Sequence, residues 1–135
     1  MLRLSQLLGL ETLLMLSVAC GDSNGTSPVP PEIGITPLQL DFTGTVGGPA
    51  PADQQFTISN VGGGSLQWTA YVELGTFASI TPTTGTAPSV LNVSVDPTGL
   101  SSGTHFYGIV IWAPIGGGAN DTLRTGGTLV LTPQE

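Results

Sequence analysis

The chain has 135 residues, of which only 8% are charged, and nine acidic residues against two arginines give a formal net charge of -7. This balance argues against binding to nucleic acid or to an anionic membrane surface, because both are bound through lysine and arginine side chains. The length leaves room for one domain. Twenty glycines and eleven prolines favour short strands joined by tight turns.

Residues 1–19 form a leucine-rich segment with Arg3 near its start and small residues at its end. This pattern is typical of a secretory signal peptide and is short for a transmembrane span. The stretch LSVAC at residues 16–20 resembles a bacterial lipobox, whose cysteine is acylated and becomes the mature N-terminus. We therefore expect Cys20 to carry a lipid that anchors the protein to a bacterial membrane, in the periplasm or at the cell surface. An ordinary signal peptide with a free cysteine and an uncleaved amphipathic helix are the alternatives.

Residues 20–32 are polar and rich in proline. They offer too little apolar surface to pack, so we expect a disordered or extended tether that holds the following domain away from the membrane. The folded domain is expected over residues 33–133.

After residue 32 no segment has the 3.6-residue period of an amphipathic helix, whereas several segments alternate apolar and polar residues as strands do. Seven strands are predicted, within residues 35–42, 54–60, 66–73, 77–80, 89–96, 104–113 and 123–131. Short strands with regularly spaced turns over about a hundred residues are typical of an immunoglobulin-like antiparallel β-sandwich. We therefore expect an all-β fold of this class.

The segment of residues 66–73 alternates strictly, with Trp68 on its apolar side. Side chains of a strand point alternately to its two faces, so Trp68 is predicted to lie in the core. Phe42 and Phe56 are predicted on the inward faces of their strands, and Phe77 at the start of the next strand is a further core residue. In the first strand the inward face is expected to include Leu38.

Two glycine triplets, residues 62–64 and 116–118, separate predicted strands. No helix is predicted after either triplet, so phosphate binding at a helix N-terminus is not supported and both are predicted to be turns. In a sandwich of this class the two turns would lie at the same pole. The pair Gly126-Gly127 is predicted to form a bulge or an irregular start of the last strand.

Six short motifs follow one another along the predicted domain. They are Leu38-x-Leu40-x-Phe42, Ile58-Ser59-Asn60-x-Gly62, Trp68, Phe77-x-x-Ile80-x-Pro82-x-x-Gly85, Leu91-x-Val93-x-Val95, and Gly103 followed by Tyr107-Gly108-x-Val110. In this order they resemble the BACON family of immunoglobulin-like domains, found mostly in bacterial surface proteins, over residues 34–132. The resemblance implies a module of carbohydrate-active or surface proteins, with carbohydrate or mucin binding proposed for some members and a spacer role for others. It assigns no binding residue.

No catalytic or metal site is expected. A single histidine, His105, and singly placed acidic residues provide neither a pair of catalytic carboxylates nor a serine–histidine arrangement. The sequence has no cluster of zinc ligands and no loop of the calcium-binding type. We therefore expect no enzyme activity, no metal and no cofactor.

Aromatic side chains are the remaining candidates for ligand binding, because sugars stack on exposed aromatic rings. The strand of residues 104–113 is apolar on both faces, so it is either covered on both sides or carries a contact surface. Trp112 on this strand is the first candidate for contact. Tyr107 on the same strand and Tyr71 on the outward face of the Trp68 strand are the others.

These observations favour a non-catalytic, lipid-anchored extracytoplasmic module that acts as a surface spacer or a protein-interaction domain. A carbohydrate- or mucin-binding module with exposed aromatic residues is the alternative, and pairing through the first or last strand is a third hypothesis. The expected partners are the membrane, through the lipid, and a polysaccharide, a mucin or a surface protein. Nucleic acid is not among them.

Overall fold

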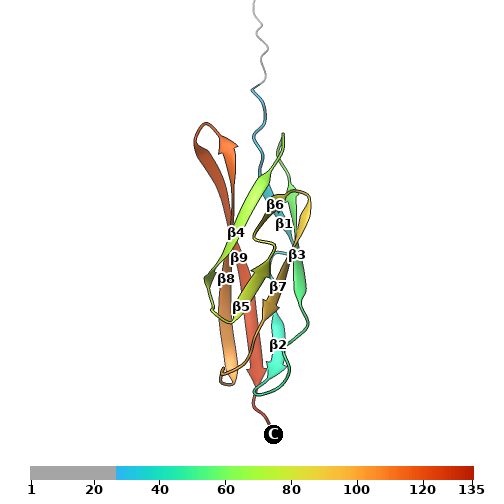
Figure 1. Ribbon diagram of the computed structural model, residues 1–135, viewed down its shortest axis with the longest axis vertical. Helices are drawn as coiled ribbons and strands as arrows, with labels where there is room; N and C mark the ends of the chain where they lie inside the picture. Colours follow the sequence, from blue (N-terminus) through green and yellow to red (C-terminus); the bar gives the residue numbers. More distant parts are fainter. Residues whose placement is uncertain (1–26) are drawn as a thin grey trace, which may run out of the picture.

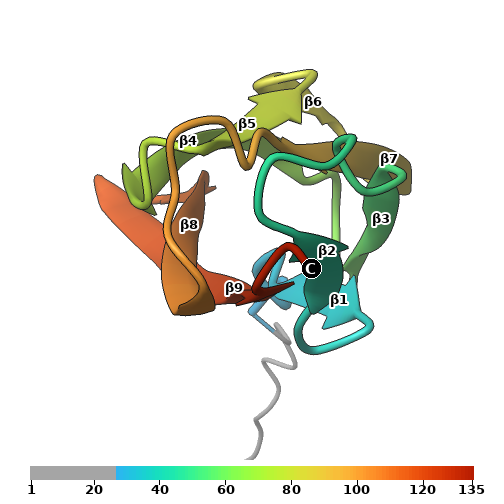
Figure 2. The same cartoon turned by 90° about the horizontal axis from the view of Figure 1, so that it is seen from below.

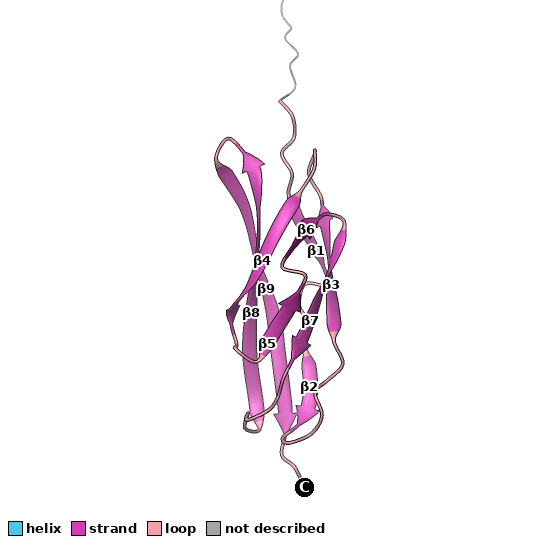
Figure 3. Ribbon diagram, in the orientation of Figure 1, coloured by secondary structure: helices cyan, strands magenta, loops and turns pink. Residues whose placement is uncertain are grey.

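The computed structural model of the protein describes residues 27–135, which form nine strands and no helix (Figures 1 and 3). The strands are β1 (Ile33–Thr36), β2 (Phe42–Thr45), β3 (Gln54–Asn60), β4 (Gln67–Leu74), β5 (Ala78–Thr81), β6 (Thr84–Thr86), β7 (Ser89–Val95), β8 (Gly103–Gly116) and β9 (Ala119–Thr132). In this part of the chain there is no helix that could cross a membrane. The predicted signal peptide and the lipidation of Cys20 lie outside the described residues.

Two sheets face each other and enclose the core, as the view along the molecule shows (Figure 2). One sheet has the order β1-β3-β7-β5 and the other has the order β2-β9-β8-β4-β6. The predicted immunoglobulin-like β-sandwich is thereby confirmed. One pairing departs from the expected antiparallel arrangement, because β2 runs parallel to β9.

The strand count differs from the seven predicted for two reasons. The first predicted strand is divided into β1 and β2, which belong to different sheets. Pro37 directly follows β1, and its missing N–H explains why the ladder to β3 ends there. The short strand β6 was not predicted, and it pairs with the start of β4.

The core residues predicted from alternation are buried. Trp68, Phe42 and Phe56 are at most 1% exposed, and Phe77 is partly buried and packs against the core. The indole Nε1 of Trp68 donates a 2.6 Å hydrogen bond to Ser89 Oγ on β7, in the opposite sheet. This bond gives the buried indole N–H of Trp68, the largest side chain of the core, an acceptor, and it connects the two sheets.

The hairpin of β8 and β9 dominates the second sheet, with 14 residues in each strand. Its ladder continues through Gly126 and Gly127 without a change of register, so the bulge predicted there is wrong. These glycines are needed for close approach instead: a Cβ at Gly127 would collide with the carbonyl oxygen of Leu40, and one at Gly126 with that of Tyr107. The register shift of the hairpin lies near its tip, between Pro114 and Gly116.

The two glycine-rich turns lie at the same pole, together with the N-terminal end of the described chain, while the C-terminus lies at the opposite pole (Figure 1). The β3–β4 turn holds the chain that precedes β1. Gly63 N donates to Pro30 O at 3.0 Å, and Val61 N donates to Glu32 O at 2.9 Å. Asn60 Oδ1 accepts a bond from Glu32 N at 3.0 Å. Backbone contacts of the folded unit therefore begin at Pro30, ahead of β1.

Candidate interaction surface

The strand β8 has one face in the core and one face outside. Its odd-numbered side chains from Tyr107 to Ala113 are buried, and Phe106, on the other face, is 63% exposed. Trp112 shares the outer face and is half-buried. The outer surface of β4, β8 and β9 therefore carries apolar side chains that the core does not cover.

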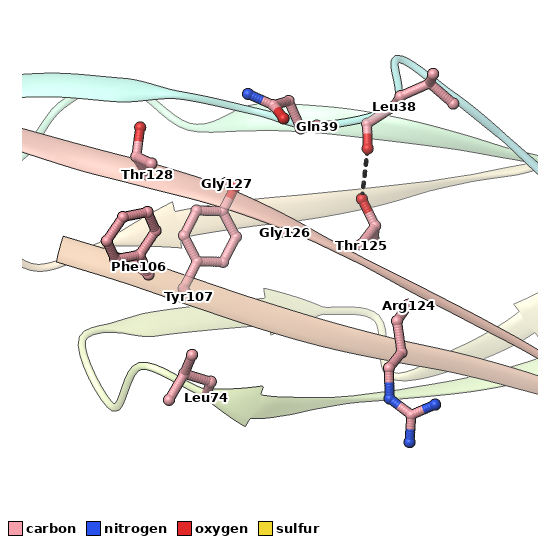
Figure 4. A pocket seen from close by; sticks show the side chains of 10 residues that line it. All are labelled: Leu38, Gln39, Leu74, Phe106, Tyr107, Arg124, Thr125, Gly126, Gly127 and Thr128. Carbon is pink, nitrogen blue, oxygen red and sulfur yellow. Dashed lines mark hydrogen bonds between the residues drawn. The ribbon is translucent and has the colours of Figure 1, made fainter. Parts of the chain in front are cut away.

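A groove crosses this outer surface (Figure 4). It has a volume of about 570 Å³, with Leu38, Leu74 and Phe106 among its lining residues. Gly126 lies in it and pairs with Gly108 on β8, so two neighbouring strands lack an outward side chain at this level. The hollow thus arises because backbone replaces side chains between three exposed apolar residues.

Two local features direct the leucines outward. In β4 the register towards β8 shifts between Val72 and Leu74, which reverses the alternation set by Trp68 and leaves Leu74 58% exposed. Leu38 lies in the crossover from β1 to β2 and is 81% exposed, so its predicted inward placement is wrong. Its carbonyl oxygen accepts a 2.7 Å bond from Thr125 Oγ1, which ties the crossover to β9.

Charged groups flank the groove. Arg124, the only lysine or arginine after residue 3, lines it and directs Nε to Glu73 Oε1 at 3.3 Å. Both side chains are largely solvated, so the pair contributes little to stability. Asp41 Oδ1 accepts bonds from Thr128 N at 3.0 Å and Thr128 Oγ1 at 2.9 Å. Hydrogen bonds from Gln39 and Thr128 lower the pKa of Asp41 below its usual value and keep the carboxylate charged.

Tyr107 is not available to a ligand, which corrects its place among the binding candidates. Its side chain is 3% exposed because it lies on the inward face of β8. The hydroxyl donates a 2.6 Å bond to Leu40 O, and the ring packs edge-on against Phe77. Burial, with a smaller effect of the Asp41 charge, raises the pKa of Tyr107 far above the usual value of 10.0.

The other two candidates lie on the outer face. Tyr71 is 48% exposed and pairs with Val110, while Trp112 pairs with Thr69. The two aromatic residues are therefore diagonal neighbours on adjacent strands, a spacing within reach of large side chains. Val110, although it points outward, is only 2% exposed between the neighbouring positions Tyr71 and Arg124. The aromatic pair and the groove belong to one continuous sheet face.

No arrangement for catalysis is found in residues 27–135. No three histidine, cysteine, aspartate or glutamate side chains of this part of the chain are grouped as metal ligands. Nε2 of His105 lies 2.8 Å from Ser101 O, and the imidazole ring packs edge-on against Phe77. These contacts hold the imidazole against the sandwich and bring no nucleophile or carboxylate to it.

The three apolar residues of the groove were not among the binding candidates predicted from sequence. Each carried a local signal. Leu74 followed the break in the alternation of β4, Leu38 followed a proline, and Phe106 lay on a strand that is apolar on both faces. The sequence did not reveal the strand register that brings these three residues together.

No protein-family model and no curated protein matches the sequence. Solved structures match by fold. A PapD-like domain of human CEP192 has a TM-score of 0.65 and 14% identity, over 90% of this chain and 99% of that one. The periplasmic chaperone SfaE has a TM-score of 0.56 and 13% identity, over 76% of this chain and 57% of the chaperone chain. WR4, a C. elegans MSP family member, has a TM-score of 0.54 and 14% identity, over 74% of this chain and 97% of the WR4 chain. At these identities the similarity shows a PapD-like, immunoglobulin-like fold.

Proposed function

We propose that the protein is a non-catalytic module, anchored outside the cytoplasm through a lipid on Cys20, and that it acts as a protein-interaction domain. The observation that carries this proposal is the exposure of Leu38, Leu74 and Phe106 around one groove. Scattered apolar residues are common on protein surfaces, but apolar residues gathered around a concave site are typical of interaction sites. The resemblance to BACON domains supports the same class of extracytoplasmic module.

Photo-crosslinking tests the interaction surface. The full chain, expressed in its native cell, would carry benzoylphenylalanine in place of Phe106 in one sample and in place of Val90 in the other. Val90 is a matched control, because it is 40% exposed on β7 of the opposite sheet. We expect a discrete adduct from position 106 alone, lost when Leu38→Ser is added. Equal labelling from both positions would contradict the proposal.

The anchor has a separate test. A Cys20→Ser variant should leave the membrane fraction, and mass spectrometry of the unaltered protein should find acyl groups on the peptide that begins with Cys20. An unmodified Cys20 in a protein that stays bound to the membrane would overturn the lipid anchor but not the interaction surface.

A carbohydrate-binding module is the second candidate, favoured by the placement of Tyr71 and Trp112 on one exposed face. Thr69 and Thr122, the cross-strand neighbours of Trp112, would supply hydroxyl groups beside the rings. The test is a pull-down on insoluble polysaccharides and mucin with the Trp112→Ala and Tyr71→Ala variants. Saturable binding that both variants lose, while Phe106→Ser keeps it, would select this function over the first.

A further inference from the structure

The parallel pair of β2 and β9 has a particular relation to the two ends of the chain. Both strands run from the pole of the N-terminal end towards the pole of the C-terminus (Figure 1). The chain enters β2 from the first pole and leaves β9 at the other. A force that separates the two ends therefore pulls β2 and β9 in opposite directions along their own axes.

Loading of this kind is shear. The hydrogen bonds of a ladder lie across the strands, so sliding one strand along the other requires several of them to break together. Pulling two neighbouring ends apart would instead break them one at a time. The parallel pairing makes the difference, because it places the pulled ends of β2 and β9 at opposite poles.

Hydrogen bonds between the segment from Leu38 to Val46 and the β8–β9 hairpin extend beyond the β2–β9 ladder of four residue pairs. Leu40 N donates to Gly126 O at 3.1 Å before the ladder, and Val46 N donates to Thr132 O at 2.9 Å after it. Side chains add further links: Thr125 Oγ1 to Leu38 O, Tyr107 Oη to Leu40 O, and Thr128 N and Oγ1 to Asp41 Oδ1.

The ladder is also protected from water on its inner side. Phe42, Leu129 and Leu131 are at most 2% exposed. Water competes poorly for hydrogen bonds above such a core, and sliding would expose these side chains. Ahead of this patch, the bonds from the β3–β4 turn to Pro30 and Glu32 and the ladder from β1 to β3 are also loaded along the strand.

We infer that the sandwich is a load-bearing unit, in which the segment from Leu38 to Val46 and strand β9 form a shear patch that resists separation of the chain ends. A force applied between two points at the same pole does not load this patch in shear. Its use in the cell, to keep the interaction surface intact while a partner pulls against the membrane, rests on the proposed anchor and interaction. The resistance itself does not depend on them.

Single-molecule force spectroscopy on the full chain tests this inference. Cys20 is the only cysteine of the sequence and provides the N-terminal handle when the chain is made by cell-free synthesis with a free thiol; Glu135→Cys provides the other. The control chain carries Cys20→Ser, Ala50→Cys and Glu135→Cys. Its handles follow β2 and β9 at the same pole, where Gly47 lies beside Gln134, so the same bonds are peeled one by one. At equal pulling speed we expect at least a twofold higher unfolding force in the first geometry.

Equal forces in the two geometries, or a lower force between the chain ends, would overturn the inference. A second comparison locates the resistance. Thr128→Val removes the side-chain bond to Asp41, and Ser94→Ala removes the 2.8 Å bond to Ser79 between β5 and β7, away from the patch. We expect Thr128→Val to lower the end-to-end unfolding force and Ser94→Ala to leave it unchanged; the reverse result would contradict the location of the patch. Neither of these contradicting force results would affect the crosslinking result at Phe106, so each proposal can fail without the other.

Discussion

The hydroxyl of Tyr107 donates a 2.6 Å hydrogen bond to the carbonyl oxygen of Leu40, which joins the middle of β8 to the crossover between β1 and β2. The bond is buried, and both residues are at most 5% exposed. Leu40 N is bound as well, by Gly126 O at 3.1 Å. The peptide groups at which the first strand changes sheets are therefore held from two neighbouring strands.

Replacing Tyr107 with phenylalanine should destabilise the fold by about 1–3 kcal/mol, because a buried carbonyl loses its partner. Urea unfolding at neutral pH measures this loss. Tyr71→Phe is the control, since Tyr71 is 48% exposed and its change should stay within about 0.5 kcal/mol. A loss no larger than that of the control would show that water replaces the hydroxyl.

The same tyrosine gives the protein an alkaline limit. Burial raises the pKa of Tyr107, so the stability that its neutral form contributes is fully present below pH 10 and is lost as the pH rises towards the raised value. Unfolding curves between pH 9 and about 12 should show the decline in the parent protein. The Tyr107→Phe variant should lack this component, and parallel declines in both proteins would rule out Tyr107 as its source.

Asp41 should govern part of the acid stability. Its pKa is lowered from 3.8 in the folded protein, so its contribution is present above that value and is lost as the pH falls through the lowered folded pKa. Asp41→Asn should therefore be less stable than the parent at pH 7 and should converge with it at acid pH. Thermal unfolding from pH 7 to about 2 measures this, with Asp53→Asn, at an exposed position before β3, as the control. A constant deficit at every pH would mean that Asp41 acts through packing instead.

Trp68 should be the costliest single residue to truncate. Trp68→Ala removes a fully buried indole and is expected to destabilise the fold by about 3–5 kcal/mol. Ser89→Ala removes only the hydroxyl that accepts the indole N–H, and should cost about 1–3 kcal/mol. Denaturant unfolding followed by circular dichroism compares the two. A larger loss in Ser89→Ala would assign the stability to the hydrogen bond rather than to packing.

Asn60 should control how firmly the chain ahead of β1 is held. Its Oδ1 accepts bonds from Glu32 N and Gly62 N, both at 3.0 Å, so Asn60→Ala should speed hydrogen exchange at these two amides. Asn92→Ala is the control, because Asn92 Oδ1 binds only the exposed side chain of Gln55. Unchanged exchange at Glu32 and Gly62 would show that the backbone bonds suffice.

The sequence by itself determined the class of fold and the inward face of the Trp68 strand, β4. Alternation around Trp68 predicts one buried face, and this prediction holds because a pleated strand has only two faces. It also placed Tyr71 outside, as the structure confirms. For β8 the sequence left two parities open, since both faces are apolar; the pairing of Ile109 with Val72 of β4 decided that Tyr107 faces inward.

Only the tertiary structure decided the groove and the division of the first strand. Leu38 was predicted inward by parity, yet the chain leaves one sheet at Pro37 and joins β9 of the other, and parity does not carry across such a crossover. Leu74 was turned outward by a register shift between two strands, which neither strand encodes alone. Periodicity is a local property that a strand imposes on its own side chains, whereas register and the exchange of sheets depend on partners distant in sequence.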